Sequence, residues 1–406
     1  MVVRSTADIV VTGLGLIGAF GDSEESLASA LNGKRGCFGR CSWFETAHQV
    51  AEVRNFRLAN YIKNPRAERS PRISQFTLAV ATQALRQAGL DRASIESAAI
   101  VYGTGNGPAV SSQRSLDTIV GENLVAVEPL VFQESVFNAP ASLVSIQFGI
   151  KGPVMVLPMG WTAGLCALKQ GCDLLRRGTV EHVLVIAADE LAGATHDALD
   201  RLGFVSPNNG GREAIRPFDL QANGTIFGEG AAAMVLELAP KAAERGVAPR
   251  ARISGCAIGG DAIGTGVSDP SSAAMVRVMR RAMAQAGRQA CDIDHVLAGT
   301  VATRKSDKAE LNALGELFAK RIPPCPVTSI KSIIGEAVGP SGLFSIAAGL
   351  IEIEKGRLFS NTNLEPPQLT GIELPLQPRQ QQVRCILINA IGVRGTYASV
   401  VLEALS

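Results

Sequence analysis

The stretch VMVLPMGWTAGLCALKQG, from Val154 to Gly171, joins a strand pattern to a helix pattern at one corner. The apolar run VMVLP is typical of a strand, and the small residues that begin near Trp161 are typical of a packed helix. Many enzymes mount a nucleophile on such a corner, because the N–H groups and dipole of the helix N-terminus stabilise an anion. Here the corner residue is tryptophan, whose indole is not a nucleophile.

The same alternation of strand and helix patterns runs along the whole chain. After about residue 250 it restarts, and PVTSIKSIIGEAVGPSGLFSIAAGLIEIEKG repeats the strand–turn–helix order of the Trp161 corner. The segments GEGAAAMVLELA and VRGTYASVVLEAL close the two parts alike. We therefore expect an α/β fold of two duplicated halves, residues 1–250 and 251–406, packed as one body. Chance similarity among α/β segments is the alternative.

Composition excludes several broad classes of function. The 406 residues are 46% hydrophobic and 19% charged, which is typical of a soluble globular protein. A net charge of +2 gives no reason to expect nucleic acid as a partner. The first residues show no targeting segment, and the longest weakly polar run, residues 337–351, is too short to span a bilayer. We expect a cytoplasmic protein without a membrane partner.

Neither a metal nor another cofactor is expected. The eight cysteines are scattered, mostly in apolar runs, and predict buried free thiols; Cys37 and Cys41 lack a second pair at zinc-ligand spacing. Gly13, Gly15 and Gly18 have the G-x-G-x-x-G spacing of a dinucleotide fingerprint. No acidic residue follows them at the end of a second strand. We interpret these glycines as a tight turn without a ligand.

Several long motifs, in the same order along the chain, resemble the β-ketoacyl synthase family of condensing enzymes. RPFDLQANGTIFGEGAAAMVLE, from Arg216 to Glu237, matches R-P-F-D-x4-G-x3-G-E-G-A. IKSIIGEAVGPSG resembles K-S-x-x-G-H-x-x-G-A-A-G, AGTVATRKSDKAE resembles H-G-T-x-T…D-x-x-E, and PLVFQESVFNAPASLVSIQFGIKGP is similar to the dimer-interface segment. The resemblance covers essentially the whole chain. It implies a thiolase-like fold with duplicated α/β halves in five layers (αβαβα).

The resemblance also implies which positions carry the chemistry. The family uses a cysteine that holds the acyl chain and two histidines that assist decarboxylation and stabilise an oxyanion. These positions fall on Trp161, Ala298 and Glu336, so no catalytic residue is expected. The family lysine is kept as Lys331, and its later acidic residue becomes Ser345. In the C-terminal loop NAIGVRGTYA, the departures from the family pattern are Val393, Arg394 and Tyr397.

No neighbouring residue is expected to replace the lost groups. Cys166 lies inside the helix, away from the activating N-terminus, and predicts a buried core thiol. His295 lies three residues before Ala298 in a strand, so it faces the opposite side of the sheet and predicts a packed or edge histidine. Glu336 beside Lys331 predicts a structural ion pair or polar plug, with an acid–base pair as the alternative.

This pattern of losses resembles the chain-length factor, a catalytically silent subunit of type II polyketide synthases. The resemblance implies a heterodimer with an active ketosynthase, an acyl carrier protein as further partner, and control of product length. Both polyenes and aromatic polyketides stay open as products. The alternative is an enzyme that re-uses the fold for other acyl chemistry through Glu336, Lys331 or Ser345.

Two structural expectations follow from the chain-length factor hypothesis. Trp161, Arg394 and Tyr397 should block the subunit's own acyl pocket, because all three are bulky replacements. Residues 129–141 should lie in the dimer interface near the partner's tunnel. The candidates for setting product length there are Leu130, Val131, Phe132 and Phe137. Ordinary interface packing is the alternative role for these four side chains.

Overall fold

The computed structural model describes residues 7–208, 213–264, 271–365, 367 and 371–405. Residues 1–6, part of the stretch on which the expectation about a targeting segment rests, lie outside the described residues. Across the described part, no helix is both long and apolar enough to cross a membrane. In the same residues, no group of three or more His, Cys, Asp or Glu side chains is placed to hold a metal ion.

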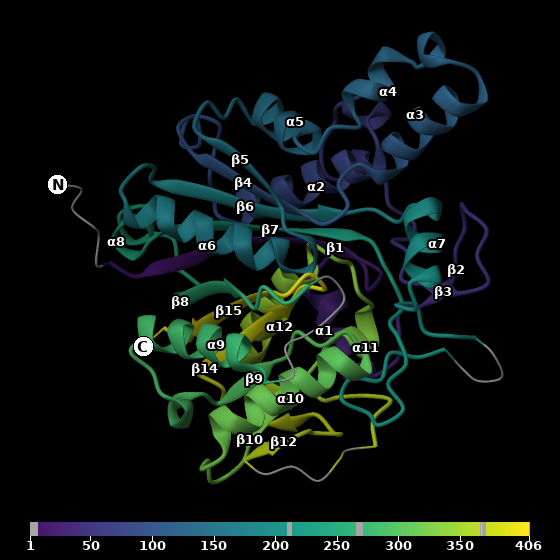
Figure 1. The fold of residues 1–406 in the computed structure, drawn as a ribbon. Coiled ribbons are helices and arrows are strands. Elements are labelled where there is room, and N and C mark those ends of the chain that lie inside the picture. The colour runs from purple at the N-terminus through teal and green to yellow at the C-terminus, as the bar shows by residue number, and fades with distance from the viewer. Residues whose placement is uncertain (1–6, 209–212, 265–270, 366, 368–370, 406) are drawn as a thin grey trace.

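The strands form two halves with the same strand order, joined edge to edge (Figure 1). In each half the pairing runs antiparallel, antiparallel, parallel and parallel. The first half has the order β1 (Ile9–Gly18), β7 (Gly230–Leu238), β6 (His182–Asp189), β4 (Ala99–Thr104), β5 (Val154–Pro158). The second has β8 (Ala251–Gly260), β15 (Thr396–Glu403), β14 (Cys385–Ile391), β9 (His295–Leu297), β10 (Cys325–Thr328), with β12 (Ile372–Glu373) at its edge. The predicted duplication is confirmed.

We propose residues 1–250 and 251–406 as the two halves of this duplication, since β8 begins at Ala251.

Helices cover both faces of each half, which gives five layers (Figure 1). The middle layer holds α6 (Ala163–Arg176) and α12 (Ser341–Lys355), and their apolar faces share one core with both halves. On the outside, α2 (Arg72–Gln87) and α5 (Ala139–Phe148) pack on the first half, and α9 (Ala273–Gln285) and α10 (Arg304–Phe318) on the second. The corner after β5 and the turn before α12 are equivalent in the two halves, as the sequence predicts.

Shorter elements connect these layers. The remaining helices are α1 (Glu24–Gly33), α3 (Ala109–Gly121), α4 (Pro129–Gln133), α7 (Gly193–Arg201), α8 (Ala239–Glu244) and α11 (Lys331–Ile334). Two small antiparallel pairs are β2 (Gly39–Arg40) with β3 (Gln49–Val50), and β11 (Arg357–Leu358) with β13 (Arg379–Gln380). α3 and α4 project from the first half at the upper right of Figure 1.

The fingerprint glycines do not form a turn, so that prediction is wrong. Gly13, Gly15 and Gly18 all lie within β1. A Cβ atom on Gly13 or on Gly15 would come within 2.1 Å of a backbone oxygen of α2, so these glycines allow the helix to lie directly on the strand. Close helix–sheet packing accounts for Gly13 and Gly15, whereas a Cβ atom on Gly18 would meet the ring of Phe20.

The cysteine prediction holds only in part. All eight are free thiols, and five of them are buried. Cys37 and Cys41 are half-buried and Cys291 is exposed, because they lie in surface loops and a short turn instead of the packed cores.

Candidate functional site: the corner after β5

The corner is a strand that turns directly into a helix. β5 ends at Pro158, a single 3-10 turn spans Gly160–Thr162, and α6 begins at Ala163. Gly160 has a φ of +59°, a conformation that favours glycine, and so it can reverse the chain here. The backbone N–H of Gly164 donates to the carbonyl of Gly339 at 3.1 Å, which ties the corner to the turn before α12. Trp161 thus lies at the entrance to α6.

Trp161 fills the space in front of that helix. Its side chain is only 6% exposed and lies against Phe204 and Phe227, with ring centroids 5.7 and 6.1 Å away. Val301 and Val338 complete the apolar wall. The cavity left beside the indole has a volume of about 30 Å³, which is room for about two water molecules. An acyl thioester has no room at this corner.

Cys166 and His295 take the places that the sequence predicts. Cys166 is buried inside α6, and burial raises the pKa of its thiol to about 11, so it stays protonated. His295 is fully buried, with Nδ1 2.7 Å from a Glu352 oxygen and Nε2 2.9 Å from the Thr328 hydroxyl. Both ring nitrogens are used in packing the sheet onto α12, so neither residue supplies a nucleophile or a base to the corner.

The side chains at the two positions where the resemblance places histidines, Ala298 and Glu336, offer no oxyanion donor. Ala298 is buried and offers only a methyl group, while its backbone N–H donates to the carbonyl of Thr328 at 2.8 Å. Glu336 is fully buried and brings a carboxylate where the family has a cationic or neutral donor. One Glu336 oxygen accepts from the N–H of Val338 at 2.7 Å and the hydroxyl of Ser341 at 2.6 Å.

Lys331 closes the remaining side of that carboxylate. Its Nζ lies 2.7 Å from the second Glu336 oxygen and donates to the carbonyl of Gly299 at 2.8 Å. Both side chains are buried, so the ammonium and the carboxylate neutralise each other away from water. Ser345, on α12, donates its hydroxyl to the backbone of Ser341 at 3.2 Å. These contacts agree with the structural ion pair that the sequence predicts.

Two buried carboxyl groups beside Lys331 are not among the candidates that the sequence predicts. Asp307 accepts from the N–H of Phe218 at 2.8 Å, and Glu310 accepts from the N–H of Gly299 at 3.0 Å and the amide of Asn389 at 3.1 Å. Burial raises the pKa of Asp307 to about 6 and that of Glu310 to about 7. They are the Asp and Glu of the D-x-x-E motif, so the motif itself is the signal that points to them. Their hydrogen bonds from backbone N–H groups indicate a structural role, in which each carboxyl group holds a neighbouring loop in place.

The C-terminal loop blocks the corner only in part. Val393 lines the small cavity beside Trp161. Arg394 is exposed, and Tyr397 lies in β15, packs in the outer core of the second half and donates its hydroxyl to Asp261 at 2.5 Å. The prediction that Arg394 and Tyr397 help to block the pocket is wrong, because the loop turns outward at Arg394 and the register of β15 directs Tyr397 to the far side of the sheet. Phe204 takes that place instead.

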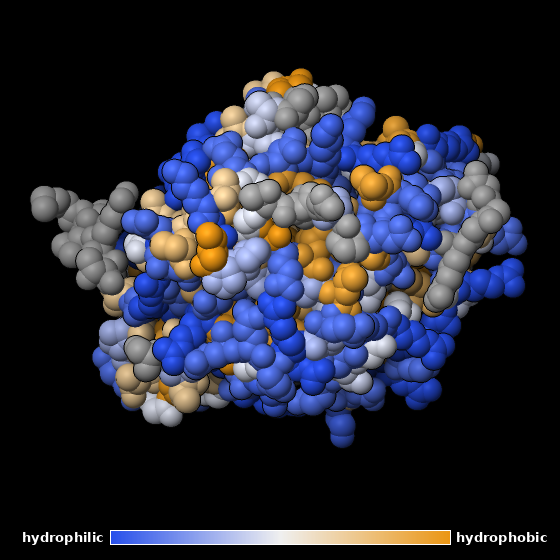
Figure 2. All heavy atoms as spheres, turned by 90° about the horizontal axis from the view of Figure 1, so that it is seen from below, coloured by the Kyte–Doolittle hydropathy of each residue, from blue (hydrophilic) through white to orange (hydrophobic). Residues whose placement is uncertain are grey.

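The segment 129–141 displays apolar side chains. Leu130 and Phe132, on α4, are 73% and 63% exposed; Val131 is half-buried, and Phe137 is 44% exposed. Nearby β5 is the last strand of its half, so one of its edges has no neighbouring strand among the described residues. By contrast, hydrophilic side chains predominate over the face seen in Figure 2, from below the second half. Exposed apolar side chains such as those of residues 129–141, hereafter the apolar arm, and an open strand edge are each typical of an interaction surface.

Comparison with known proteins agrees with this architecture. Residues 6–242 match the model of the β-ketoacyl synthase N-terminal domain, and residues 250–365 match that of the C-terminal domain. The tetracenomycin polyketide synthase ketoacyl synthase alpha subunit of Streptomyces glaucescens is 29% identical over 97% of this chain and 96% of its own.

Two solved structures share the fold. The ishigamide ketosynthase/chain length factor superposes with a TM-score of 0.90 at 22% identity, over 99% of this chain and 100% of that chain. The type II acyl-carrier protein complex AntDE:AntF, whose ketosynthase is bound to the hexaketide, gives 0.89 at 21% identity with the same coverage. Together with the two domain matches and the geometry above, the conclusion is that the chain belongs to the β-ketoacyl synthase family.

Proposed function

We propose that this chain is a non-catalytic, chain-length factor-like subunit that pairs with an active ketosynthase in type II polyketide biosynthesis, in the cytoplasm, and shapes product length. The observation that carries the proposal is the corner itself, where a buried indole occupies the nucleophile position and leaves about 30 Å³. The polyketide synthase subunit and the ketosynthase/chain length factor among the similar proteins support the pathway.

The surroundings of Trp161 support a loss of catalysis over a change of reaction. Condensation needs a thiolate nucleophile and donors aimed at a developing oxyanion. The Glu336 carboxylate would repel such an oxyanion, and its own oxygens are already engaged by Lys331, Val338 and Ser341. The alternative chemistry through Glu336, Lys331 or Ser345 has no specific observation in its favour, because every one of these side chains already contacts a partner within the fold.

The partner is proposed to lie on the apolar arm and the open edge of β5. The exposed side chains there include Leu130, Phe132, Phe137 and, on α5, Ile146. Apolar surface of this kind is expensive to leave in water, so a stable partner subunit is expected to cover it. The acyl carrier protein would then deliver the growing chain to the partner's cysteine, because this chain offers no site for it.

Phe137 links the arm to the corner and supports a role in chain length. Its ring lies over Gly107, where an added Cβ would come within 2.6 Å of the ring. Gly107 belongs to the loop after β4. Gly105 of the same loop lies against Val338, which packs on Trp161. In the proposed heterodimer, the Phe137 ring would end an apolar tunnel if the partner covers it, because one further two-carbon unit would clash with it.

The test is co-expression with an active ketosynthase, followed by mass spectrometry of intact subunits after incubation with malonyl- and acyl-loaded carrier protein. We expect the acyl adduct on the partner alone, and an altered product length for Phe132→Ala and Val131→Ala. Leu220→Ala, an exposed leucine outside the arm, should leave the product unchanged. A stable homodimer of this chain that turns over acyl thioesters without a partner would overturn the proposal.

A further inference from the structure

A second site lies at the other end of α6, where a hollow of about 400 Å³ opens between α6, β8 and α9. The helix rises about 1.5 Å per residue, so this hollow is about 20 Å from the Trp161 corner. Its lining residues are Lys169, Asp173, Arg176, Arg177, Cys256, Arg281 and Gln285. A ligand in this hollow would therefore be independent of the proposed function.

The hollow has an excess of positive charge. Lys169 forms an ion pair with Asp173, and Arg176 lies 3.8 Å from the same carboxylate. Arg177 and Arg281 are exposed, and among the residues that the structure describes no carboxylate lies within ion-pair distance of either. The hollow thus contains four cations and one carboxylate, which pairs with only two of them. In water at low salt, like charges gathered around one hollow repel one another unless an anion joins them.

Helix stability explains only part of this cluster. Cations near the C-terminus of α6 interact favourably with its dipole, which accounts for Arg176 and Arg177. Arg281 comes from α9, in front of its last turn, and gains nothing from that dipole. The dipole of α6 therefore does not account for the position of Arg281 at the same hollow.

The other lining groups offer donors and no free negative charge. The side-chain oxygen of Gln285 accepts from the backbone N–H of Cys256 at 3.1 Å, which leaves the amide NH₂ of Gln285 as a donor. Cys256 is buried, and a hydrogen bond with Cys172, together with burial, raises the pKa of its thiol, so it stays neutral beneath the cations. Such a set of donors complements an oxyanion with several acceptor oxygens.

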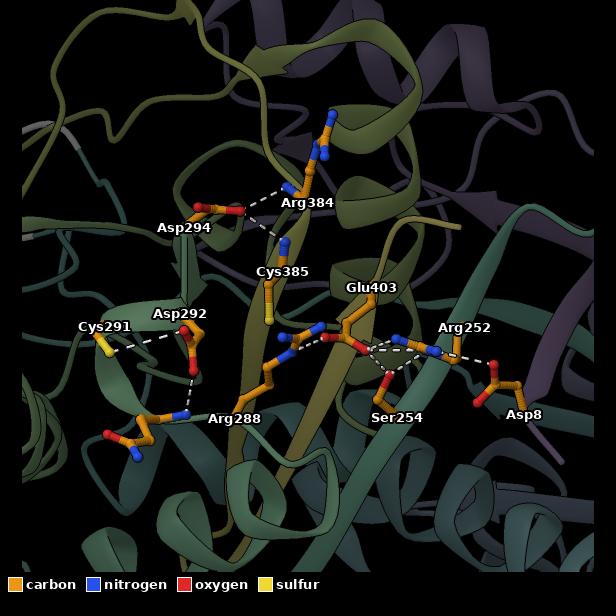
Figure 3. Close-up of polar contacts among 11 residues, drawn as sticks. Asp8, Arg252, Ser254, Arg288, Cys291, Asp292, Asp294, Arg384, Cys385 and Glu403 are labelled. Atoms are coloured by element: carbon orange, nitrogen blue, oxygen red, sulfur yellow. Dashed lines mark hydrogen bonds and ion pairs between the residues drawn. The ribbon is translucent and has the colours of Figure 1, made fainter. Parts of the chain in front are cut away.

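A second charged hollow shows the opposite arrangement (Figure 3). It has a volume of about 760 Å³ and also contains arginines. There Arg252 and Arg288 both point to Glu403, and Arg252 also reaches Asp8 at 3.0 Å (Figure 3). The chain supplies its own counter-charges in that hollow, so it needs no ligand. The hollow beside α6 lacks them.

We propose that the hollow between α6, β8 and α9 is a binding site for the phosphate group of a small phosphorylated molecule. Arg281 and Arg177 are the side chains free to make charge-assisted hydrogen bonds to its oxygens, with Lys169 and Arg176 as supporting charges. A volume of about 400 Å³ admits a small phosphate ester and is too small for a folded partner.

The test is isothermal titration of the purified chain, alone or with its partner subunit, with inorganic pyrophosphate at low and at physiological ionic strength. We expect saturable binding of one pyrophosphate per chain, weakened about tenfold in Arg281→Gln and in Arg177→Gln. Arg280→Gln is the matched control, since it removes the same charge from the same helix but from a surface pair with Glu316. Its affinity should stay within about twofold of the wild type.

Thermal unfolding separates this result from a folding defect. Without the anion, Arg281→Gln should unfold at the same temperature as the wild type or higher, because a repulsion is removed. Pyrophosphate should raise the midpoint of the wild type and of Arg280→Gln but not that of Arg281→Gln. Equal binding by all variants, equal weakening in Arg280→Gln, or tighter binding of a single-stranded DNA oligonucleotide than of pyrophosphate would each overturn the proposal.

Discussion

Replacing Trp161 with alanine should destabilise the chain strongly and open a cavity that binds small apolar molecules. The indole is 6% exposed and is enclosed by Phe204, Phe227, Val301 and Val338. These neighbours come from four different segments of the chain. Because each is fixed by its own segment, they cannot all collapse into the space that the indole leaves.

The size of the effect follows from the void. Removing the indole enlarges the present space of about 30 Å³ to one on the order of 150 Å³, a size at which an apolar cavity stays dry. The added volume of about 120 Å³ costs about 3 kcal/mol at about 24 cal/mol for each Å³, and the lost transfer free energy of the buried side chain adds about 2 kcal/mol. The sum of about 5 kcal/mol lies at the upper end of the range of about 3–5 kcal/mol for buried tryptophan-to-alanine changes.

Urea unfolding followed by circular dichroism, at one fixed protein concentration, measures the loss. Trp43→Ala is the matched control, because Trp43 is the only other tryptophan and is 40% exposed. This variant should lose about 1 kcal/mol of unfolding free energy or less. Benzene should raise the stability of Trp161→Ala and leave the other two proteins unchanged. Equal losses for both tryptophans, or a benzene effect common to all three proteins, would refute the idea that Trp161 fills the acyl site.

Three further outcomes are expected in the same urea assay. Glu336→Gln leaves the buried Lys331 ammonium unpaired and should lower the free energy of unfolding by about 3–5 kcal/mol. The double variant with Lys331→Met should lose less stability, and equal losses for the single and double variants would contradict an ion pair between the two side chains. Burial raises the pKa of Glu310 to about 7, so the fold favours its protonated form. The contribution of Glu310 to the free energy of unfolding, on the order of 3 kcal/mol, should be fully present below about pH 4.5 and lost as the pH rises through 7. Glu310→Gln should remove this pH dependence. Gly13→Ala brings a Cβ within 2.1 Å of a backbone oxygen and should cost more than about 2 kcal/mol, while Gly33→Ala, with nothing within 4 Å, should be nearly neutral.

The corner and the duplication could be predicted because both are local patterns. The run from Val154 to Pro158 is apolar and short, the turn after it contains glycine, and a small-residue helix follows, so the position of Trp161 is fixed within the chain itself. The same logic applies to β10 and α12 in the second half. The alternation of faces along a strand is equally local, and it is enough to predict that His295 points away from the Ala298 position.

The contents of the pocket could not be predicted, because they depend on contacts between distant segments. Phe204 and Phe227 reach Trp161 from a loop and from the segment before β7, and no spacing in the sequence relates them to the corner. The orientation of Tyr397 escapes prediction for a related reason. A motif gives its position in the chain, but the register of β15 against β14 and β8 decides the side to which it points.

A buried carboxylate connects the surroundings of Trp161 with the loop beneath Phe137, and this bears on how a silent corner can still affect a product. The buried Asp189 carboxylate accepts from the N–H groups of Gly105 at 2.7 Å and of Gly339 at 2.8 Å. The carboxylate thereby joins two segments. One is the loop after β4, whose Gly107 lies against the ring of Phe137, and the other is the turn that contains Val338, which packs on Trp161. Loss of the indole would loosen that turn and, through the shared carboxylate, the support beneath Phe137. In the proposed function, the corner therefore acts on the partner's chain through packing, since it has no reactive group with which to act through chemistry.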